Sequence, residues 1–130
     1  MMGKVYVMGA GPGDPDLLTV EAVRVLRAAE VVLHDDLVSS KILELIPAST
    51  QVRNVGKSGD QDAISLEKIH SLLISAAREG RHAVWLKAGD PLGLASTDEE
   101  MEILAQAGVE FEVIPNAASA MGAAAGANSR

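Results

Sequence analysis

Residues 4–14 read Lys4-Val5-Tyr6-Val7-Met8-Gly9-Ala10-Gly11-Pro12-Gly13-Asp14. The first half, Lys4–Gly9, has the β-branched and aromatic residues of a buried strand. The glycines that follow permit a sharp turn and let a ligand approach the backbone closely. A helical pattern of apolar residues then runs over Leu17–Ala29. Strand, glycine-rich turn and helix in this order are typical of the start of an α/β domain.

The rest of the chain continues the alternation of strand and helix. Further β-rich runs occur at Val31–His34, Gln51–Val55, Ala83–Lys87 and Phe111–Ile114. Helical patterns lie between them, over Ser39–Ile46, from a cap at Ser65 to Gly80, and from a capping box formed by Thr97 and Glu100 to Gly108. The sequence therefore predicts an α/β fold with an open, mostly parallel five-stranded sheet and helices on both faces.

Composition narrows the class of protein. At 130 residues and 48% hydrophobic residues, the chain fits one globular domain, which we assign to residues 1–115, with 116–130 as an Ala/Gly-rich tail at the start of a missing second domain. A net charge of -7 without any basic run argues against nucleic acid or an anionic membrane as partner. The absence of cysteine excludes disulfides and thiolate metal sites, and no apolar run has the length of a membrane span. A cytoplasmic protein is the resulting expectation.

Histidine gives no sign of a metal site. The three histidines are scattered, without the spacing of metal ligands, and no metal is expected. We interpret His34 as a loop residue, and His70 and His82 as residues on the surface or at the ends of helices.

Polar or glycine-rich segments follow the predicted strands. Besides the glycine-rich turn, these are His34-Asp35-Asp36, Gly56-Lys57 and Ala88-Gly89-Asp90-Pro91. The carboxyl ends of parallel strands line the ligand crevice of an open sheet, so these segments are expected to converge. There Asp35 can accept a proton, and Lys57 can donate one or hold an anionic group.

Simpler interpretations of the same segments stay open. Asp35 also suits a helix cap or a turn, and Lys57 a solvated surface. The glycine-rich segment also suits a tight turn alone. It departs from the dinucleotide-binding fingerprint, because its third glycine comes after one intervening residue rather than two. The chain has neither a G-x-S-x-G turn nor a P-loop lysine.

Taken together, the segments Gly-Ala-Gly-Pro-Gly-Asp-Pro-Asp-Leu-Leu-Thr, His-Asp-Asp-Leu-Val-Ser, Val-Gly-Lys, Lys-Ala-Gly-Asp-Pro and Val-Ile-Pro resemble the uroporphyrinogen-III C-methyltransferases of the tetrapyrrole methylase superfamily. The resemblance implies methyl transfer from S-adenosyl-L-methionine to tetrapyrrole carbons, on the route to sirohaem and cobalamin. It also implies two α/β domains, of which this chain would be the first. By the same resemblance Asp35 is the proton acceptor and Lys57 the proton donor, and the cofactor contacts are Pro12, Ala88, Gly89 and Asp90, with Gly93, Ala118 and Ser119 nearby.

The sequence departs from the family pattern at charged positions. Three arginines of the family correspond to Asp36, Ser58 and Ser96 here, and one of its glycines corresponds to Ala88. Since the family's substrate carries many carboxylates, these changes predict weakened or altered binding. Low activity of this chain by itself is expected for another reason, because one domain cannot enclose a cofactor that the family holds between two. A second copy or a partner is expected to supply the missing half of the site. The alternatives are a non-catalytic binding or scaffold domain, and a related methylase with a less acidic acceptor.

Overall fold

The protein is seen in a computed structural model, which describes residues 2–9, 19–35, 38–56, 64–87 and 95–114. Strands and helices alternate along these residues in the order β1 (Lys4–Gly9), α1 (Val20–Ala28), β2 (Val31–His34), α2 (Ser40–Leu43), β3 (Gln51–Asn54), α3 (Leu66–Arg78), β4 (Ala83–Lys87), α4 (Ala95–Gln106) and β5 (Glu110–Ile114). The alternation predicted from the sequence is confirmed.

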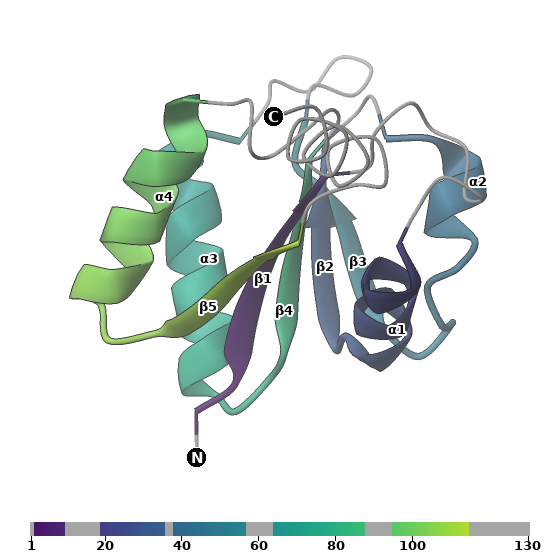
Figure 1. The fold of residues 1–130 in the computed structure, drawn as a ribbon, viewed down its shortest axis with the longest axis horizontal. Coiled ribbons are helices and arrows are strands. Elements are labelled where there is room, and N and C mark those ends of the chain that lie inside the picture. The colour runs from purple at the N-terminus through teal and green to yellow at the C-terminus, as the bar shows by residue number, and fades with distance from the viewer. Residues whose placement is uncertain (1, 10–18, 36–37, 57–63, 88–94, 115–130) are drawn as a thin grey trace, which may run out of the picture.

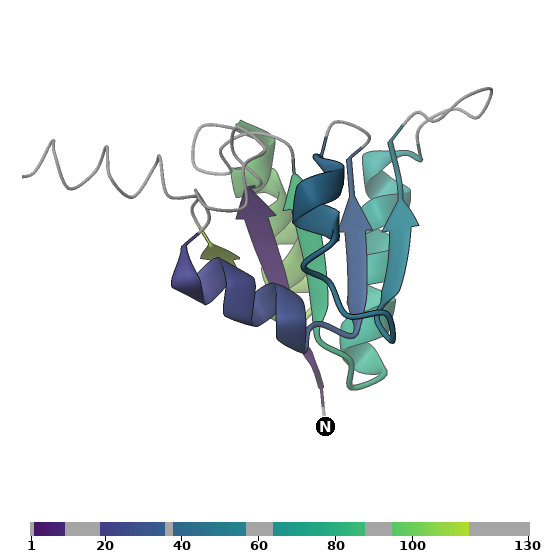
Figure 2. The same ribbon diagram turned by 90° about the vertical axis from the view of Figure 1, so that its right-hand side faces the viewer.

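The five strands form one sheet in the order β3-β2-β4-β1-β5. Every neighbouring pair is parallel, so the sheet is entirely rather than mostly parallel. Helices α1 and α2 cover one face of the sheet, and α3 and α4 cover the other (Figures 1 and 2). The predicted α/β architecture with helices on both faces is therefore confirmed.

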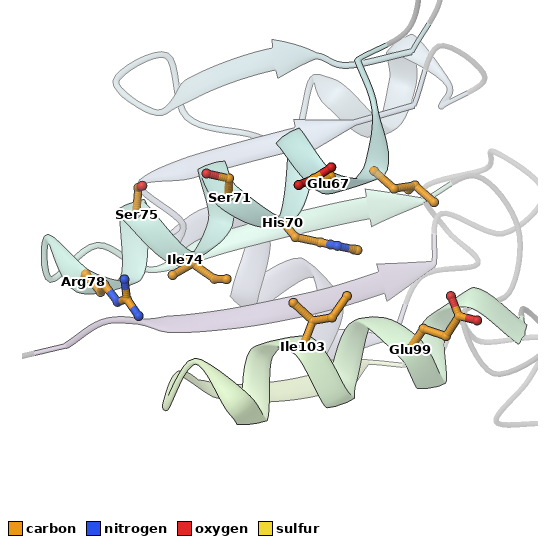
Figure 3. Close-up of a pocket in the computed structure, with 9 residues that line it drawn as sticks. Glu67, His70, Ser71, Ile74, Ser75, Arg78, Glu99 and Ile103 are labelled. Carbon is orange, nitrogen blue, oxygen red and sulfur yellow. The ribbon is translucent and has the colours of Figure 1, made fainter.

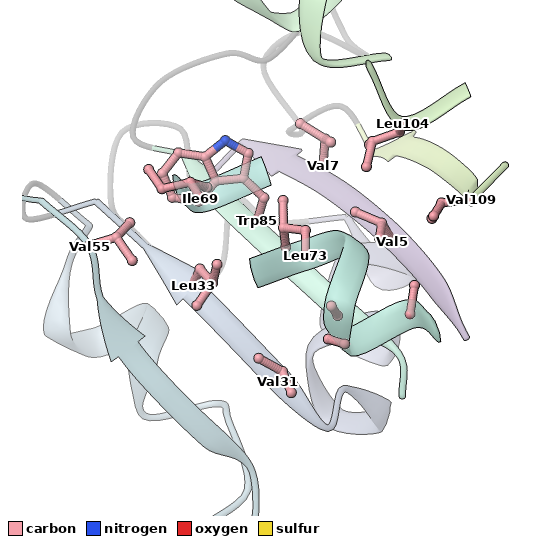
Figure 4. Close-up of a cluster of buried hydrophobic side chains, with 13 residues drawn as sticks. Val5, Val7, Val31, Leu33, Val55, Ile69, Leu73, Trp85, Leu104 and Val109 are labelled. Carbon is pink, nitrogen blue, oxygen red and sulfur yellow. The ribbon is translucent and has the colours of Figure 1, made fainter. Parts of the chain in front are cut away.

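The described residues form two buried apolar clusters, one on each face of the sheet. All residues of β4 are buried, because β4 lies between β2 and β1 and helices cover both of its faces. Its side chains alternate, so that Ala83 and Trp85 belong to the cluster under α3 and α4, while Val84 and Leu86 belong to the cluster under α1 and α2. Figure 4 shows the first cluster, with Trp85 beside α3. Trp85 thus packs in the core.

The ends of the helices show which of the predicted caps and helix bounds were correct. The Ser65 side chain accepts a hydrogen bond from the Lys68 amide at 3.2 Å, and Gly80 ends the same helix at a φ of 85°. Helix α1 begins at Val20, later than predicted, and helix α2 is shorter than predicted. The predicted capping box is wrong, because α4 already begins at Ala95 and therefore contains Thr97.

A close backbone contact at Gly3 gives a first prediction. The Gly3 amide donates to the Ala77 carbonyl at 2.7 Å, and a methyl group at Gly3 would overlap the carbonyl of Arg81. We expect Gly3→Ala to lower the free energy of unfolding by about 1–3 kcal/mol, because backbone on both sides must shift. Urea denaturation followed by far-UV circular dichroism measures the loss.

The matched control for this change is Gly108→Asn. Gly108 has a φ of 74°, which asparagine tolerates, and no atom lies within 4 Å of an added Cβ. The control is expected to lose less stability than Gly3→Ala. Equal losses would contradict the steric explanation.

Candidate functional site

The topology creates a switch point between β1 and β4. From β1 the chain crosses to β2 through α1 on one face, whereas from β4 it crosses to β5 through α4 on the other face. The two strands are nevertheless neighbours, and their last residues, Gly9 and Lys87, are register partners. In open α/β sheets, ligands bind outside the carboxyl ends of the strands at such a point. The candidate site therefore lies where β1 and β4 end.

The strand ends that precede the predicted motifs are adjacent. Gly9 and Lys87 lie side by side, and in the sequence Gly9 leads into the glycine-rich segment and Lys87 into Ala88-Gly89-Asp90. The Asp35 amide donates to the Leu86 carbonyl at 3.3 Å, which places the end of β2 on the other side of β4. For the described residues, the expected convergence of the strand ends is confirmed.

Asp35 is the predicted site residue that the structure describes. It follows β2 directly and is half-buried. Its carbonyl oxygen accepts a hydrogen bond from the Val38 amide at 3.3 Å and lies 2.9 Å from Nδ1 of His34. The backbone around Asp35 is thus held from both sides, beside the end of β4. The other predicted site residues lie outside the described residues, namely Lys57, Pro12, Ala88, Gly89, Asp90, Gly93, Ala118 and Ser119.

Two histidine assignments were wrong. His34 ends β2 with 6% of its surface exposed, and His70 is buried in α3 at 7%. His82 follows α3, and its Nδ1 accepts a hydrogen bond from the Lys4 amide at 3.2 Å. Among the described residues, no group of three histidine or acidic side chains is placed to hold a metal.

No described helix has the length and apolar character needed to cross a membrane.

A buried ion pair at the end of β4 was missed by the sequence analysis. Lys87 Nζ lies 2.5 Å from Oε1 of Glu100 on α4, and their side chains are only 4% and 1% exposed. One signal was available, because Glu100 precedes the buried Leu104 by four residues and so shares the inward face of its helix. Glu100 was instead interpreted as part of a capping box. The ion pair places opposite charges beside the switch point.

Cavities lined by the described residues lie elsewhere. One of about 540 Å³ lies between α3 and α4, lined by Glu67, His70, Ile74, Ile103 and their neighbours (Figure 3). Another of about 390 Å³ lies near the start of β1. Neither is formed by the strand ends that make up the candidate site.

The second cavity contains an ion pair of modest importance. Lys4 Nζ donates to Glu112 Oε1 at 3.3 Å, with side-chain exposures of 23% and 40%. Desolvation alone would lower the pKa of Lys4, but the hydrogen bond and the charge of Glu112 outweigh it, and the pKa is raised above its ordinary value of 10.5. Partly exposed pairs of this kind contribute little to stability.

The fold and the switch point define a class, that of α/β proteins that bind a ligand at the carboxyl edge of a parallel sheet. Comparison with known families makes the assignment specific, because the family described as Tetrapyrrole (Corrin/Porphyrin) Methylases matches residues 4–129. The chain belongs to this family, as its resemblance in sequence predicted.

Individual relatives agree with the family assignment. A siroheme synthase of Hahella chejuensis is 46% identical over 123 residues, covering 95% of this chain and 26% of the relative. The crystal structure of uroporphyrin-III-C-methyltransferase from Thermus thermophilus matches with a TM-score of 0.77 and 45% identity, over 89% of this chain and 48% of that one. Another structure of the Thermus enzyme, complexed with S-adenyl homocysteine, matches with a TM-score of 0.71 and 42% identity, over 88% of this chain and 45% of that one. This chain thus spans between a quarter and a half of the length of these relatives.

Proposed function

We propose that this chain is the N-terminal domain of an S-adenosyl-L-methionine-dependent uroporphyrinogen III C-methyltransferase. The observation that supports the proposal is the register of Gly9 with Lys87 at the switch point, because a ligand is expected at such strand ends and each of them leads in the sequence into a glycine-rich segment. The relatives' names supply the chemistry. One is a uroporphyrin-III-C-methyltransferase, and another structure of it holds S-adenyl homocysteine, the demethylated form of the cofactor.

The residues at the strand ends fit a cofactor of this kind. Gly9 has no side chain to obstruct the edge of the sheet, and Pro12 follows three residues later in the sequence. We assign the cofactor contacts to Pro12 and to Ala88, Gly89 and Asp90, with Gly93, Ala118 and Ser119 beside them. The cofactor, when bound, supplies a methyl group on a positively charged sulfur. A carboxylate such as that of Asp90 is suited to nearby cationic or hydroxyl groups of the cofactor.

The proposed acid and base are the residues that follow β2 and β3 in the sequence. Methylation of a pyrrole carbon requires that a proton be removed, and the Asp35 carboxylate is the proposed acceptor. The hydrogen bond from the Asp35 amide to the Leu86 carbonyl supports this role, because it holds Asp35 beside the end of β4, next to the proposed cofactor position. Lys57 follows β3, which pairs with β2, and is the proposed donor of a proton. The opposite face of the cleft is proposed to come from a second domain or from a second copy of the chain.

Binding of S-adenosyl-homocysteine, measured by isothermal titration calorimetry, tests the cofactor assignment without the tetrapyrrole. We expect the chain to bind it and Asp90→Ala to weaken the affinity by about 10-fold to 100-fold, as loss of a hydrogen bond to a charged group does. Asp90→Ala also changes the net charge by one unit. The matched control is Glu102→Ala, which makes the same change at an exposed position on α4.

The possible results separate the proposed functions. Binding that is weakened by Asp90→Ala and unchanged by Glu102→Ala supports a methyltransferase cofactor site. If the unaltered chain binds no S-adenosyl-homocysteine at millimolar concentration, the proposal fails and a non-catalytic scaffold is favoured. If the chain binds S-adenosyl-homocysteine but uroporphyrinogen III is not methylated even when the second domain is supplied, a methylase with another acceptor is favoured.

A further inference from the structure

The cavity of about 540 Å³ between α3 and α4 lies on an exposed face of the molecule (Figure 3). Two of the residues that line it, Leu66 on α3 and Ile103 on α4, are large apolar side chains with exposures of 50% and 37%. The other exposed large apolar side chains among the described residues, Met2, Val20 and Val52, lie on three separate parts of the chain. Exposed apolar side chains from two helices thus stand beside this cavity.

Charged side chains mark the two ends of the same cavity. Glu67 lies in the first turn of α3, whereas Arg78 is the last residue of that helix. Figure 3 shows Glu67 and Glu99 toward one end of the cavity and Arg78 at the other. Ser71 and Ser75 line the stretch between the ends, one helical turn apart, and both are exposed. The face therefore has an acidic end, small side chains in its middle and a basic end.

The charges on this face are complementary to those on a second copy of it. In a dimer with two-fold symmetry the same patch serves both copies, so two α3 helices that meet across the axis lie antiparallel. If the axis passes midway between Leu72 and Leu73, Glu67 of each copy faces Arg78 of the other. Opposite charges then meet at both ends of the helix pair.

The same pairing matches large side chains with small ones. It sets Ile74 of each copy opposite Ser71 of the other, and His70 opposite Ser75. Small residues leave a shallow groove on a helix surface, into which a ridge of larger side chains from another helix can pack. His70 is 7% exposed, and its Nε2 has no hydrogen-bond partner among the described residues. A serine hydroxyl can donate or accept a hydrogen bond, so it is compatible with either tautomer of the histidine.

We propose that the face formed by α3 and α4 around this cavity is an interface through which two copies of the chain associate as a symmetric dimer, with their α3 helices antiparallel. The proposal commits to one register, in which Glu67 of each copy meets Arg78 of the other. It does not rest on the proposed function, because the strand ends of the candidate site do not line this cavity.

Sedimentation equilibrium of the full chain tests the interface. We expect a monomer–dimer equilibrium in which Glu67→Arg and Arg78→Glu each raise the dissociation constant at least about 10-fold, because each sets like charges together twice in a symmetric dimer. The variant with both changes exchanges the charges and is expected to associate within about 3-fold of the unaltered chain. Arg78 also donates a hydrogen bond to the Ala107 carbonyl of its own chain at 3.4 Å. Since the double variant lacks this bond as well, its recovery shows that the charges across the interface matter.

Matched controls separate this contact from the net charge of the chain. Glu102→Arg changes the charge by the same two units as Glu67→Arg, at an exposed position on α4 that does not line the cavity. Lys68→Glu does the same for Arg78→Glu, at an exposed position on α3 outside the cavity. Both controls are expected to leave the dissociation constant within about 3-fold of that of the unaltered chain. Controls that weaken the dimer as strongly as the two reversals would overturn the proposed contact.

Ser71→Trp tests the interface by size rather than by charge. Ser71 is exposed, so the far-UV circular dichroism of this variant is expected to stay unchanged. Its indole would occupy the space assigned to Ile74 of the second copy, and we expect the dissociation constant to rise at least about 10-fold.

Three results would overturn the proposal. A chain that sediments as a monomer up to about 1 mM has no such dimer, and the face would then be left for the second domain of a longer chain or for another partner. A dimer that tolerates Glu67→Arg, Arg78→Glu and Ser71→Trp associates through a different face. A double variant that associates no more tightly than the single reversals excludes the antiparallel register.

Discussion

Glu100→Leu is expected to lower the free energy of unfolding by about 3–5 kcal/mol, because it removes the carboxylate that pairs with the buried ammonium group of Lys87. Replacing both residues, as Lys87→Met with Glu100→Leu, is expected to restore most of this loss, because no charge then remains buried. The measurement is urea denaturation followed by the fluorescence of Trp85, the single tryptophan of the chain.

The neighbouring glutamate provides the control for this prediction. Glu99 is exposed, whereas Glu100 is 1% exposed, so Glu99→Leu makes the same chemical change outside the core. We expect Glu99→Leu to change stability by no more than about 0.5 kcal/mol. Similar effects of the two substitutions would contradict the buried ion pair.

Trp85→Ala is also expected to have a large effect, lowering the free energy of unfolding by about 3–5 kcal/mol. Trp85 is 3% exposed and packs with Ile69, Leu73 and Leu33 beneath α3, so truncation leaves a large cavity (Figure 4). Trp85→Phe is expected to cost less, because it keeps an aromatic ring and removes an indole N–H that has no partner among the described residues. Far-UV circular dichroism is the appropriate probe, since both variants lack tryptophan.

Val52→Ala is the control for this truncation. Val52 lies on the edge strand β3 and is 43% exposed, so removing apolar atoms there opens no cavity. We expect Val52→Ala to lower the free energy of unfolding by much less than Trp85→Ala does. If the two truncations cost the same, Trp85 does not occupy the core position described.

Strands were predicted well because buried parallel strands have a distinctive sequence. β1, β2 and β4 have the bounds that their apolar runs predicted. Local capping chemistry was also reliable where it acts alone, as at Ser65. It failed at Thr97 and Glu100, since the spacing of a capping box does not reveal whether the glutamate faces the helix end or the core.

The candidate site could be predicted in part. Asp35 was identified from its position after a strand, and the structure places it beside the end of β4. Its partners across the sheet could not be predicted, because strand order depends on long-range pairing. Lys87 was missed for a related reason. A lysine at a strand end is ordinarily solvated, and only the position of α4 shows that Lys87 forms an ion pair with Glu100.

The order of strands has a consequence for synthesis of the chain on the ribosome. Neither β1 nor β2 pairs with the other, and each has β4 as a neighbour. Val5 and Val31 both align with Ala83, so the centre of the sheet is missing until residues 83–87 have been made. Until then β2 and β3 can pair, but β1 has no partner, and such long-range pairing slows folding. A nascent chain that ends before β4 therefore exposes the sheet-facing sides of β1 and α1, and it is at this stage that chaperones have most to bind.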